Sequence, residues 1–242
     1  MASRFSDLVR RAWQPLLIGA AAGALFIGFA PWRAATGATF LAPPSQLPAA
    51  AYDAPAGDVA VLSGGCFWGM QGVFQHVKGV RQVLAGYAGG KAGTANYELV
   101  STGTTGHAES IKISFDPAQI SYAEILRIYF SVATDPTQVG GQFPDEGTQY
   151  RGEIWYQNAA QKLIAERYIA QLNAAKRFHH PITTRVDAYS GFYPAEAYHQ
   201  DYLVHNPGSP YIATYDMPKV EALKKYFPTE WRPAPVLALA SR

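Results

Sequence analysis

The sequence predicts an α+β domain with a mixed, mainly antiparallel sheet, and two patterns lead to that prediction. Short alternating or β-branched stretches are separated by stretches whose apolar residues recur every three or four positions, as expected for strands between helices. Their order, β-α-β-β-α-β-α-β, is typical of a two-layer fold with a split β-α-β, ferredoxin-like core. The 242 residues are 48% hydrophobic and 16% charged, which is enough for one sizeable core.

Each element has a local reason. Apolar residues at helical spacing from Phe67 to Val77 predict a helix that begins after Cys66 and stops near Gly79. Ser121 begins a capping box for the next helix, and Asn158 is a good cap for a longer one. In order, we expect strands at 58–62, 80–90 (ending in a loop), 109–115, 152–156 and 183–189, and helices at 67–79, 122–132, 159–176 and 194–206.

The N-terminus has the layout of a targeting segment. Three arginines at positions 4, 10 and 11 precede an uncharged apolar run at residues 15–30. That run is shorter than the roughly 20 residues that a spanning helix usually needs, which favours a cleaved signal over a retained anchor. We therefore expect residues 1–38 to be a signal peptide or N-terminal membrane anchor. The protein would be exported, either periplasmic or tethered to the inner membrane and facing the periplasm.

The rest of the chain divides by composition. Residues 39–56 are rich in Ala and Pro and predict a linker, residues 57–232 predict the folded domain, and residues 233–242 predict a flexible tail. A formal net charge of +2 with scattered Lys and Arg shows no nucleic-acid footprint. We expect a monomer.

Cys66 is the only cysteine, which excludes an internal disulfide, a C-x-x-C redox pair and a multi-cysteine zinc site. It follows Gly64 and Gly65 at a predicted turn from strand to helix. A helix N-terminus favours the thiolate and lowers the pKa of a cysteine there, so we expect a reactive thiol. The alternative is a small buried apolar cysteine, which is the commonest fate of a single one.

Other candidate side chains surround this prediction. Phe67 and Trp68 cannot both face one core from a helix, so at least one should line an apolar slot beside the sulfur. Glu109 shares the period-2 face of an apolar strand, where reduced solvation would raise its pKa and make it a proton donor, although a strand-end position facing solvent is equally compatible. Neutral donors and a carboxylate complete the set: Tyr97, Tyr150 and Asp145.

The histidines give weaker signals. His107, His199 and His205 each remain a candidate for a Cys–His pair with Cys66. The pair His179–His180 has no third ligand at suitable spacing, so we expect a loop pair and no metal site.

The motifs GGCFWG, GYAGG, TGHAE, DEGTQYR and YHQDYL occur in the order and approximate spacing of peptide methionine sulfoxide reductase A, which residues 57–232 resemble. The resemblance implies a two-layer α/β roll and reduction of methionine-S-sulfoxide, free or in oxidised proteins, as a protein repair. It makes Cys66 the nucleophile and Glu109 the acid, and gives substrate binding to a set of five residues: Phe67, Trp68, Tyr97, Asp145 and Tyr150.

Two departures from the family pattern bear on mechanism. Gln71 stands where many members have a glutamate, and no resolving cysteine follows NPGS near the C-terminus. With no bound cofactor expected, an oxidised Cys66 would need an external thiol, such as a thioredoxin-like protein, a glutaredoxin or a small thiol. Two other functions keep some of these features: a one-cysteine peroxidase or redox sensor, and a tethered domain that binds methionine-containing peptides without turnover.

Overall fold

A computed structural model describes residues 41–47 and 57–238. The predicted signal or anchor, residues 1–38, lies outside these ranges, as do parts of the linker and tail. Within them, no helix is long and apolar enough to cross a membrane.

One six-stranded sheet carries the domain. Its strand order is β7-β6-β1-β3-β2-β8, with β6 and β7 parallel and every other neighbouring pair antiparallel. Because β3 lies between β1 and β2, the unit β1-α1-β2 is a split β-α-β, which confirms the predicted α+β class. The strands are β1 (Val59–Ser63), β2 (Val80–Ala88), β3 (Ala108–Phe115), β6 (Glu153–Tyr156), β7 (Arg185–Ala188) and β8 (Phe192–Pro194), and a separate hairpin is formed by β4 (Gly141–Gln142) and β5 (Asp145–Glu146).

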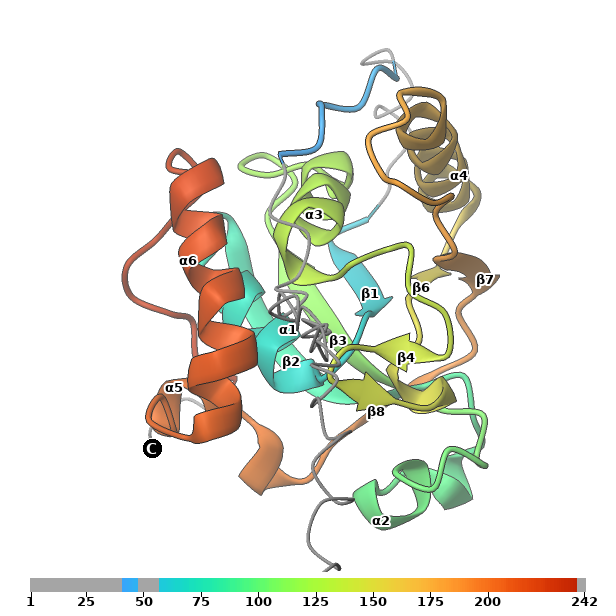
Figure 1. The fold of residues 1–242 in the computed structure, drawn as a ribbon, viewed down its shortest axis with the longest axis vertical. Coiled ribbons are helices and arrows are strands. Elements are labelled where there is room, and N and C mark those ends of the chain that lie inside the picture. The colour runs from blue at the N-terminus through green and yellow to red at the C-terminus, as the bar shows by residue number, and fades with distance from the viewer. Residues whose placement is uncertain (1–40, 48–56, 239–242) are drawn as a thin grey trace, which may run out of the picture. The chain divides into compact units, whose positions relative to one another are not determined.

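The helices make the second layer, with α1 packed between the sheet and α6 (Figure 1). Asn158 and Ser121 cap α4 and α3 through their side-chain oxygens, as their positions predict. The helix α3 continues as a π-helical turn, Tyr129–Ala133, and another such turn, Ile212–Asp216, leads into α6. The helices are α1 (Phe67–Gln75), α2 (Tyr97–Val100), α3 (Tyr122–Ile128), α4 (Ala159–Ala174), α5 (Tyr202–His205) and α6 (Met217–Tyr226).

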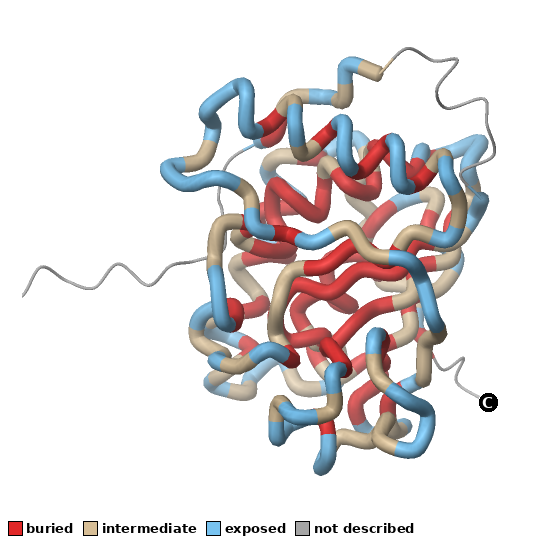
Figure 2. Tube along the Cα trace, turned by 90° about the vertical axis from the view of Figure 1, so that its right-hand side faces the viewer, coloured by how far each residue is buried: buried red, intermediate tan, exposed pale blue. Residues whose placement is uncertain are grey.

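The core lies mainly on the α1 side of the sheet, and buried segments run through the centre of the domain (Figure 2). Ala60 and Leu62 of β1 point into it, while the alternate residue Val61 faces a smaller cluster on the other side with Trp155. The strand β3 follows the same alternation, so its odd-numbered residues extend the main core up to the first turn of α1.

Three local differences from the sequence-based elements have tertiary causes. The helix α1 ends at Gln75 and not near Gly79, because Val77 pairs with Trp231 in a β-bridge. The short helix predicted at 194–206 is split: Pro194 pairs with Gly86 at the sheet edge, and α5 begins only after Asp201, whose φ of 58° interrupts the helix. Sequence periodicity did not predict three of the observed elements: α2, α6 and the β4–β5 hairpin.

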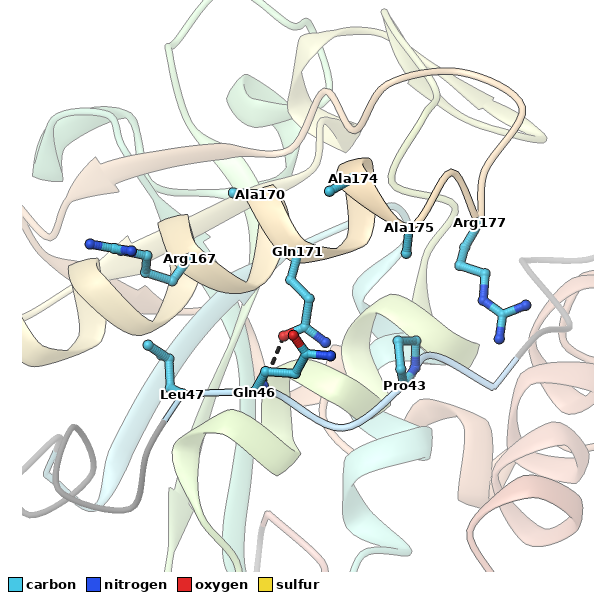
Figure 3. A pocket seen from close by; sticks show the side chains of 9 residues that line it. All are labelled: Pro43, Gln46, Leu47, Arg167, Ala170, Gln171, Ala174, Ala175 and Arg177. Atoms are coloured by element: carbon cyan, nitrogen blue, oxygen red, sulfur yellow. Dashed lines mark hydrogen bonds between the residues drawn. The ribbon is translucent and has the colours of Figure 1, made fainter.

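Residues 41–47, from the predicted linker, lie along α3 and α4 as a strap. The Ala42 N–H donates to Ser131 Oγ, and the Tyr168 hydroxyl donates to the Pro43 carbonyl, at 2.9 and 2.7 Å. Gln171 holds the far end, where it accepts from the Gln46 N–H at 2.8 Å and lines a pocket between the strap and α4 (Figure 3). The linker therefore contains a segment that is bound to the domain.

Residues 233–238 of the predicted tail also contact the domain. The Val236 N–H donates to the Gln75 carbonyl at 3.0 Å, and the Ala238 N–H donates to Asp201 at 2.8 Å. Both bonds tie the C-terminal segment to the end of α1 and to the start of α5.

Candidate active site

Cys66 lies where β1 turns into α1, at the N-cap position of that helix. The turn needs Gly65, because its φ is +94° and a Cβ there would lie 2.7 Å from Gln142. Cys66 is 7% exposed, so the residue is almost completely buried. The backbone N–H of Trp68 bonds toward the sulfur, as a helix N-terminus should.

The expected lowering of the Cys66 pKa is wrong. Burial raises the pKa of the thiol well above its ordinary range, and the negative charges of Glu109 when it is ionised, of Asp216 and of Asp145 add to that effect. The bond from Trp68 lowers the pKa but is outweighed. The helix end does favour the thiolate, but the burial of Cys66 and the carboxyl groups that tertiary folding brings beside it outweigh that effect.

Glu109 is one of those groups, and it is buried beside Cys66. It ends the inward face of β3, and its Oε2 accepts the Phe67 N–H at 3.0 Å, so a strand residue caps the first turn of α1. The side chain is 4% exposed, which decides between the two sequence-based alternatives in favour of the buried one. Burial, with smaller contributions from the charges of Asp145 and Asp216, raises the pKa of Glu109 to about 8 against the lowering effect of the Phe67 bond.

The two aromatic residues after Cys66 have different positions. Phe67 is buried against Tyr87 and His199, with ring centroids 5.9 and 5.1 Å away. Trp68 is half-buried and stacks on Tyr202 at 3.9 Å with an interplanar angle of 14°. Its indole N–H donates to His199 Nδ1 at 3.2 Å, which fixes the ring next to the cysteine. Of the two rings, Trp68 is therefore the less buried one and the candidate aromatic wall beside Cys66.

Two tyrosine hydroxyls share the environment of Cys66 and Glu109. Tyr97 begins α2, and its N–H donates to Glu196, which also accepts from the Tyr87 hydroxyl. Burial raises the pKa of Tyr97 and of Tyr150, and the charges of Glu109 and Cys66 raise both further. Both hydroxyls therefore stay protonated and can donate a hydrogen bond at neutral pH.

Arg151 holds together the chain segments that carry Glu109 and Tyr150. It donates to the carbonyls of Gly106 and His107 at 3.1 and 3.2 Å, and to the Thr148 carbonyl at 2.9 Å. The buried Glu153 pairs with it at 2.5 Å, and that carboxyl has a pKa raised by burial to about 7. The GHAE and GTQYR segments are thus one interconnected unit in the fold.

Asp145 is on β5 and accepts a hydrogen bond from the Tyr211 hydroxyl. Burial raises the pKa of Asp145, while the Tyr211 bond and the charge of Lys219 lower it. Sequence reasoning missed Tyr211, which also belongs to the surroundings of Cys66. Burial raises the pKa of its hydroxyl most, and the charge of Cys66 is the next largest cause of the rise. No motif or period marks that tyrosine, because its segment reaches the site only through the packing of α6 on α1.

The histidine candidates separate clearly. His199 touches the aromatic wall, and burial lowers its pKa, which keeps it neutral. His107 is buried but bound to the Gly90 N–H and the Lys91 carbonyl, whereas His205 is exposed. His179 and His180 are exposed after α4, and in the ranges the structure describes no group of three or more possible ligands could hold a metal ion.

Gln71, the departure from the family pattern, is buried and fully used. Its amide donates to the Val83 carbonyl and to Gln200 Oε1 at 2.9 and 3.1 Å, and its oxygen accepts the Asp201 N–H at 2.9 Å. A glutamate could not make both donated bonds, because an ionised carboxylate has no donor and a protonated one has a single O–H. Gln71 therefore anchors α1 to β2 and the start of α5.

Comparison with known proteins agrees with this arrangement. A family model described as peptide methionine sulfoxide reductase matches residues 58–231. The chain is 52% identical over 188 residues to peptide methionine sulfoxide reductase MsrA 2 of Mesorhizobium japonicum, covering 78% of this chain and 96% of the relative. It is 49% identical over 168 residues to a protein of the same name from Synechocystis, covering 69% and 78%.

Two solved structures are similar as well. Methionine sulfoxide reductase A of Corynebacterium diphtheriae has 33% identity and a TM-score of 0.54, with 63% of this chain and 76% of that chain covered. Mxr1 of Saccharomyces cerevisiae in reduced form has 28% identity and a TM-score of 0.57, with 62% and 86% covered.

Proposed function

Because the chain belongs to the peptide methionine sulfoxide reductase A family and is thus an oxidoreductase that reduces methionine sulfoxide, we propose that Cys66 is its nucleophile and Glu109 its proton donor. The observation that carries the assignment is the position of Glu109 beside the only cysteine. Cys66 is the N-cap of α1, and the buried carboxyl group of Glu109, with a pKa of about 8, accepts the N–H of the next residue, Phe67. A protonated acid beside a sulfur nucleophile is what sulfoxide reduction needs, because the oxygen leaves sulfur only when protonated.

The first step balances within the site. The Cys66 sulfur gives an electron pair to the sulfoxide sulfur and forms an S–S bond, while Glu109 donates its proton to the oxygen and the thiol proton of Cys66 restores Glu109. The hydroxyl group then moves to the Cys66 sulfur as the S–O and S–S bonds of the methionine sulfur break, so that the thioether leaves with an electron pair and Cys66 becomes a sulfenic acid. Cysteine sulfur is oxidised by two electrons and methionine sulfur is reduced by two.

The surrounding side chains support one orientation of the substrate. Trp68 offers an apolar wall for the methyl group, while Tyr97 and Tyr150 offer hydroxyl donors for the oxygen. Charge develops on that oxygen as the S–O bond weakens, so fixed donors stabilise the transition state. A site that fixes methyl and oxygen separately distinguishes the two epimers, and we assign it to the S epimer.

Regeneration requires an external thiol, since the chain has no second cysteine. The donor thiol attacks the sulfenic sulfur and releases water, and a second thiol then frees Cys66 from the mixed disulfide. A thioredoxin-like protein, a glutaredoxin or a small thiol satisfies this chemistry. We also propose that the basic and apolar segment at residues 1–38 exports the enzyme, so that repair takes place in the periplasm or at the inner membrane facing it.

Mass spectrometry of Cys66 after one equivalent of methionine-S-sulfoxide, without reductant, tests the proposal. We expect one added oxygen on Cys66 and one methionine formed for each chain, with no reaction of the R epimer. Cys66→Ser should form no methionine. Methionine formed without oxidation of Cys66 would refute the assignment, and a much faster reaction with hydrogen peroxide than with the sulfoxide would favour a peroxidase.

A further inference from the structure

Asp216 and Lys219 form a buried ion pair that the proposed reaction does not use. The side chain of Asp216 is fully buried, and that of Lys219 is 9% exposed, with Nζ 3.2 Å from Asp216 Oδ1. In the part of the chain that the structure describes, Asp216 Oδ2 has no hydrogen-bond partner. A buried carboxylate that is only half satisfied costs stability, so its presence beside a reactive group calls for a functional reason.

The carboxylate is directed at α1. Asp216 is the N-cap residue of α6, yet its side chain makes no capping bond to that helix. Its Oδ1 lies only 2.0 Å from the point that a Cβ on Gly69 would occupy, and Lys219 Nζ lies 3.1 Å from that point. Gly69 follows Cys66 by three residues, one turn along the same helix face. The pair is therefore packed on the first turn that begins at the cysteine.

The position of Asp216 opposes what the helix end would do alone. The positive end of a helix dipole favours a thiolate, but a carboxylate on the first turn interacts with that same positive end. The helix α1 has no charged residue of its own, so neighbouring elements determine the charge around the sulfur. The groups that face Cys66 are Glu109 from β3, Asp145 from β5, the hydroxyls of Tyr97, Tyr150 and Tyr211, and Asp216 with its partner Lys219.

We propose that Asp216, held as a carboxylate by Lys219, is a positioning residue that keeps the Cys66 sulfur in its thiol form while no substrate is bound. This inference rests on the proposed role of Cys66 and adds a protective one. A thiolate reacts with peroxide or a foreign disulfide, whereas a thiol does so slowly. Suppressing the thiolate between turnovers spares the one sulfur that the chain cannot rescue with a cysteine of its own.

Alkylation of the purified full chain by iodoacetamide from pH 6 to 11 tests the inference, because Cys66 is the only thiol. In Asp216→Asn we expect the midpoint of the alkylation rate to fall by about one pH unit, with a rate about tenfold higher at any pH below both midpoints. Oxidation of Cys66 by hydrogen peroxide at pH 7 should accelerate by a similar factor.

Glu124→Gln is the matched control, because Glu124 forms an i,i+3 ion pair with Arg127 at 2.9 Å on α3. Its midpoint should equal that of the parent. The double variant Asp216→Asn/Lys219→Met removes both charges and should also fall below the parent, and it decides the question if Asp216→Asn does not fold. An unchanged or higher midpoint in the folded variants would overturn the inference. Alkylation needs no substrate, so this result is independent of whether the parent reduces the S-sulfoxide.

Discussion

The carboxyl groups of Glu109 and Asp216 both contact the first turn of α1, but they have different partners. Glu109 comes from β3 and accepts one backbone N–H, whereas Asp216 precedes α6 and pairs with Lys219. Burial raises the pKa of both, and only at Asp216 does a neighbouring cation oppose the rise. The comparison teaches that a counter-ion decides the protonation state of a buried carboxyl group: Glu109, without one, holds a proton, whereas Asp216, paired with Lys219, carries a negative charge.

The strongest way to break this comparison is to remove the stored proton. Glu109→Gln keeps an oxygen for the Phe67 N–H but has no proton to deliver, so sulfenic acid formation should slow by about 10²–10⁴-fold with KM little changed. The parent rate should fall as pH rises through about 8, the pKa of Glu109, and the variant should lack that fall. Single-turnover kinetics from pH 6 to 9 measure both. The exposed Glu98→Gln is the control, and an equal rate in Glu109→Gln would refute its role as the acid.

The next effect is on stability. The Glu109 carboxyl has a pKa of about 8 in the folded chain and about 4.5 when unfolded, so the folded state holds more protons between these values. The stability of the parent therefore falls as pH rises through that window, by on the order of 4–5 kcal/mol for this group. Glu109→Gln should lack that pH dependence, so its free energy of unfolding should rise relative to that of the parent between pH 5 and pH 8. Urea unfolding at both pH values compares them, and identical pH dependence would contradict a buried, protonated Glu109.

The fold was predictable where local patterns agree with tertiary structure. The alternation in β3 predicts the inward face of Ile111, Ile113 and Phe115, and the caps Asn158 and Ser121 begin the helices that they predict. The strap at residues 41–47 was not predictable, because its backbone is held by side chains of α3 and α4 far along the chain. Sequence composition alone cannot distinguish a bound segment from a free linker.

The site shows the same division. Cys66, Glu109 and the residues of the motifs lie together, since strand and helix ends bring them there. The predicted direction of the Cys66 pKa shift was wrong, because burial of the thiol raises its pKa most and the charges of Glu109 and Asp216 add to that rise. Asp216 comes from a C-terminal helix start that no motif marked. Its partner Lys219 looked like one more scattered surface lysine. Charge balance at a site depends on contacts distant in sequence, and that is where reasoning from one segment fails.

A larger side chain at Gly69 tests whether the Asp216–Lys219 pair is packed on α1. Gly69→Ala would improve helix propensity by about 1 kcal/mol in an open helix, but its Cβ would collide with Asp216 Oδ1. We expect a net loss of about 1–3 kcal/mol in the free energy of unfolding, since the ion pair must shift. Denaturant titration measures it. Gly93→Ala, with nothing within 4 Å of its new Cβ, should change stability by less than about 0.5 kcal/mol. A stabilised Gly69→Ala protein would mean that the pair is not packed on α1.

The smallest effect concerns the hydroxyls that act with Glu109. Tyr97→Phe keeps the ring on His199, whose centroid is 4.5 Å away, and removes only the donor. Each of Tyr97→Phe and Tyr150→Phe should lower kcat by about tenfold, the usual worth of one hydrogen bond to a charged oxygen. Steady-state kinetics separate kcat from KM, with Tyr189→Phe, 37% exposed, as the control. The oxygen gains charge only as the S–O bond breaks, so hydroxyls that stabilise this charge affect kcat. A loss confined to KM would show that the two hydroxyls hold the substrate without stabilising the transition state. Stabilisation of the leaving oxygen would then rest on Glu109 alone.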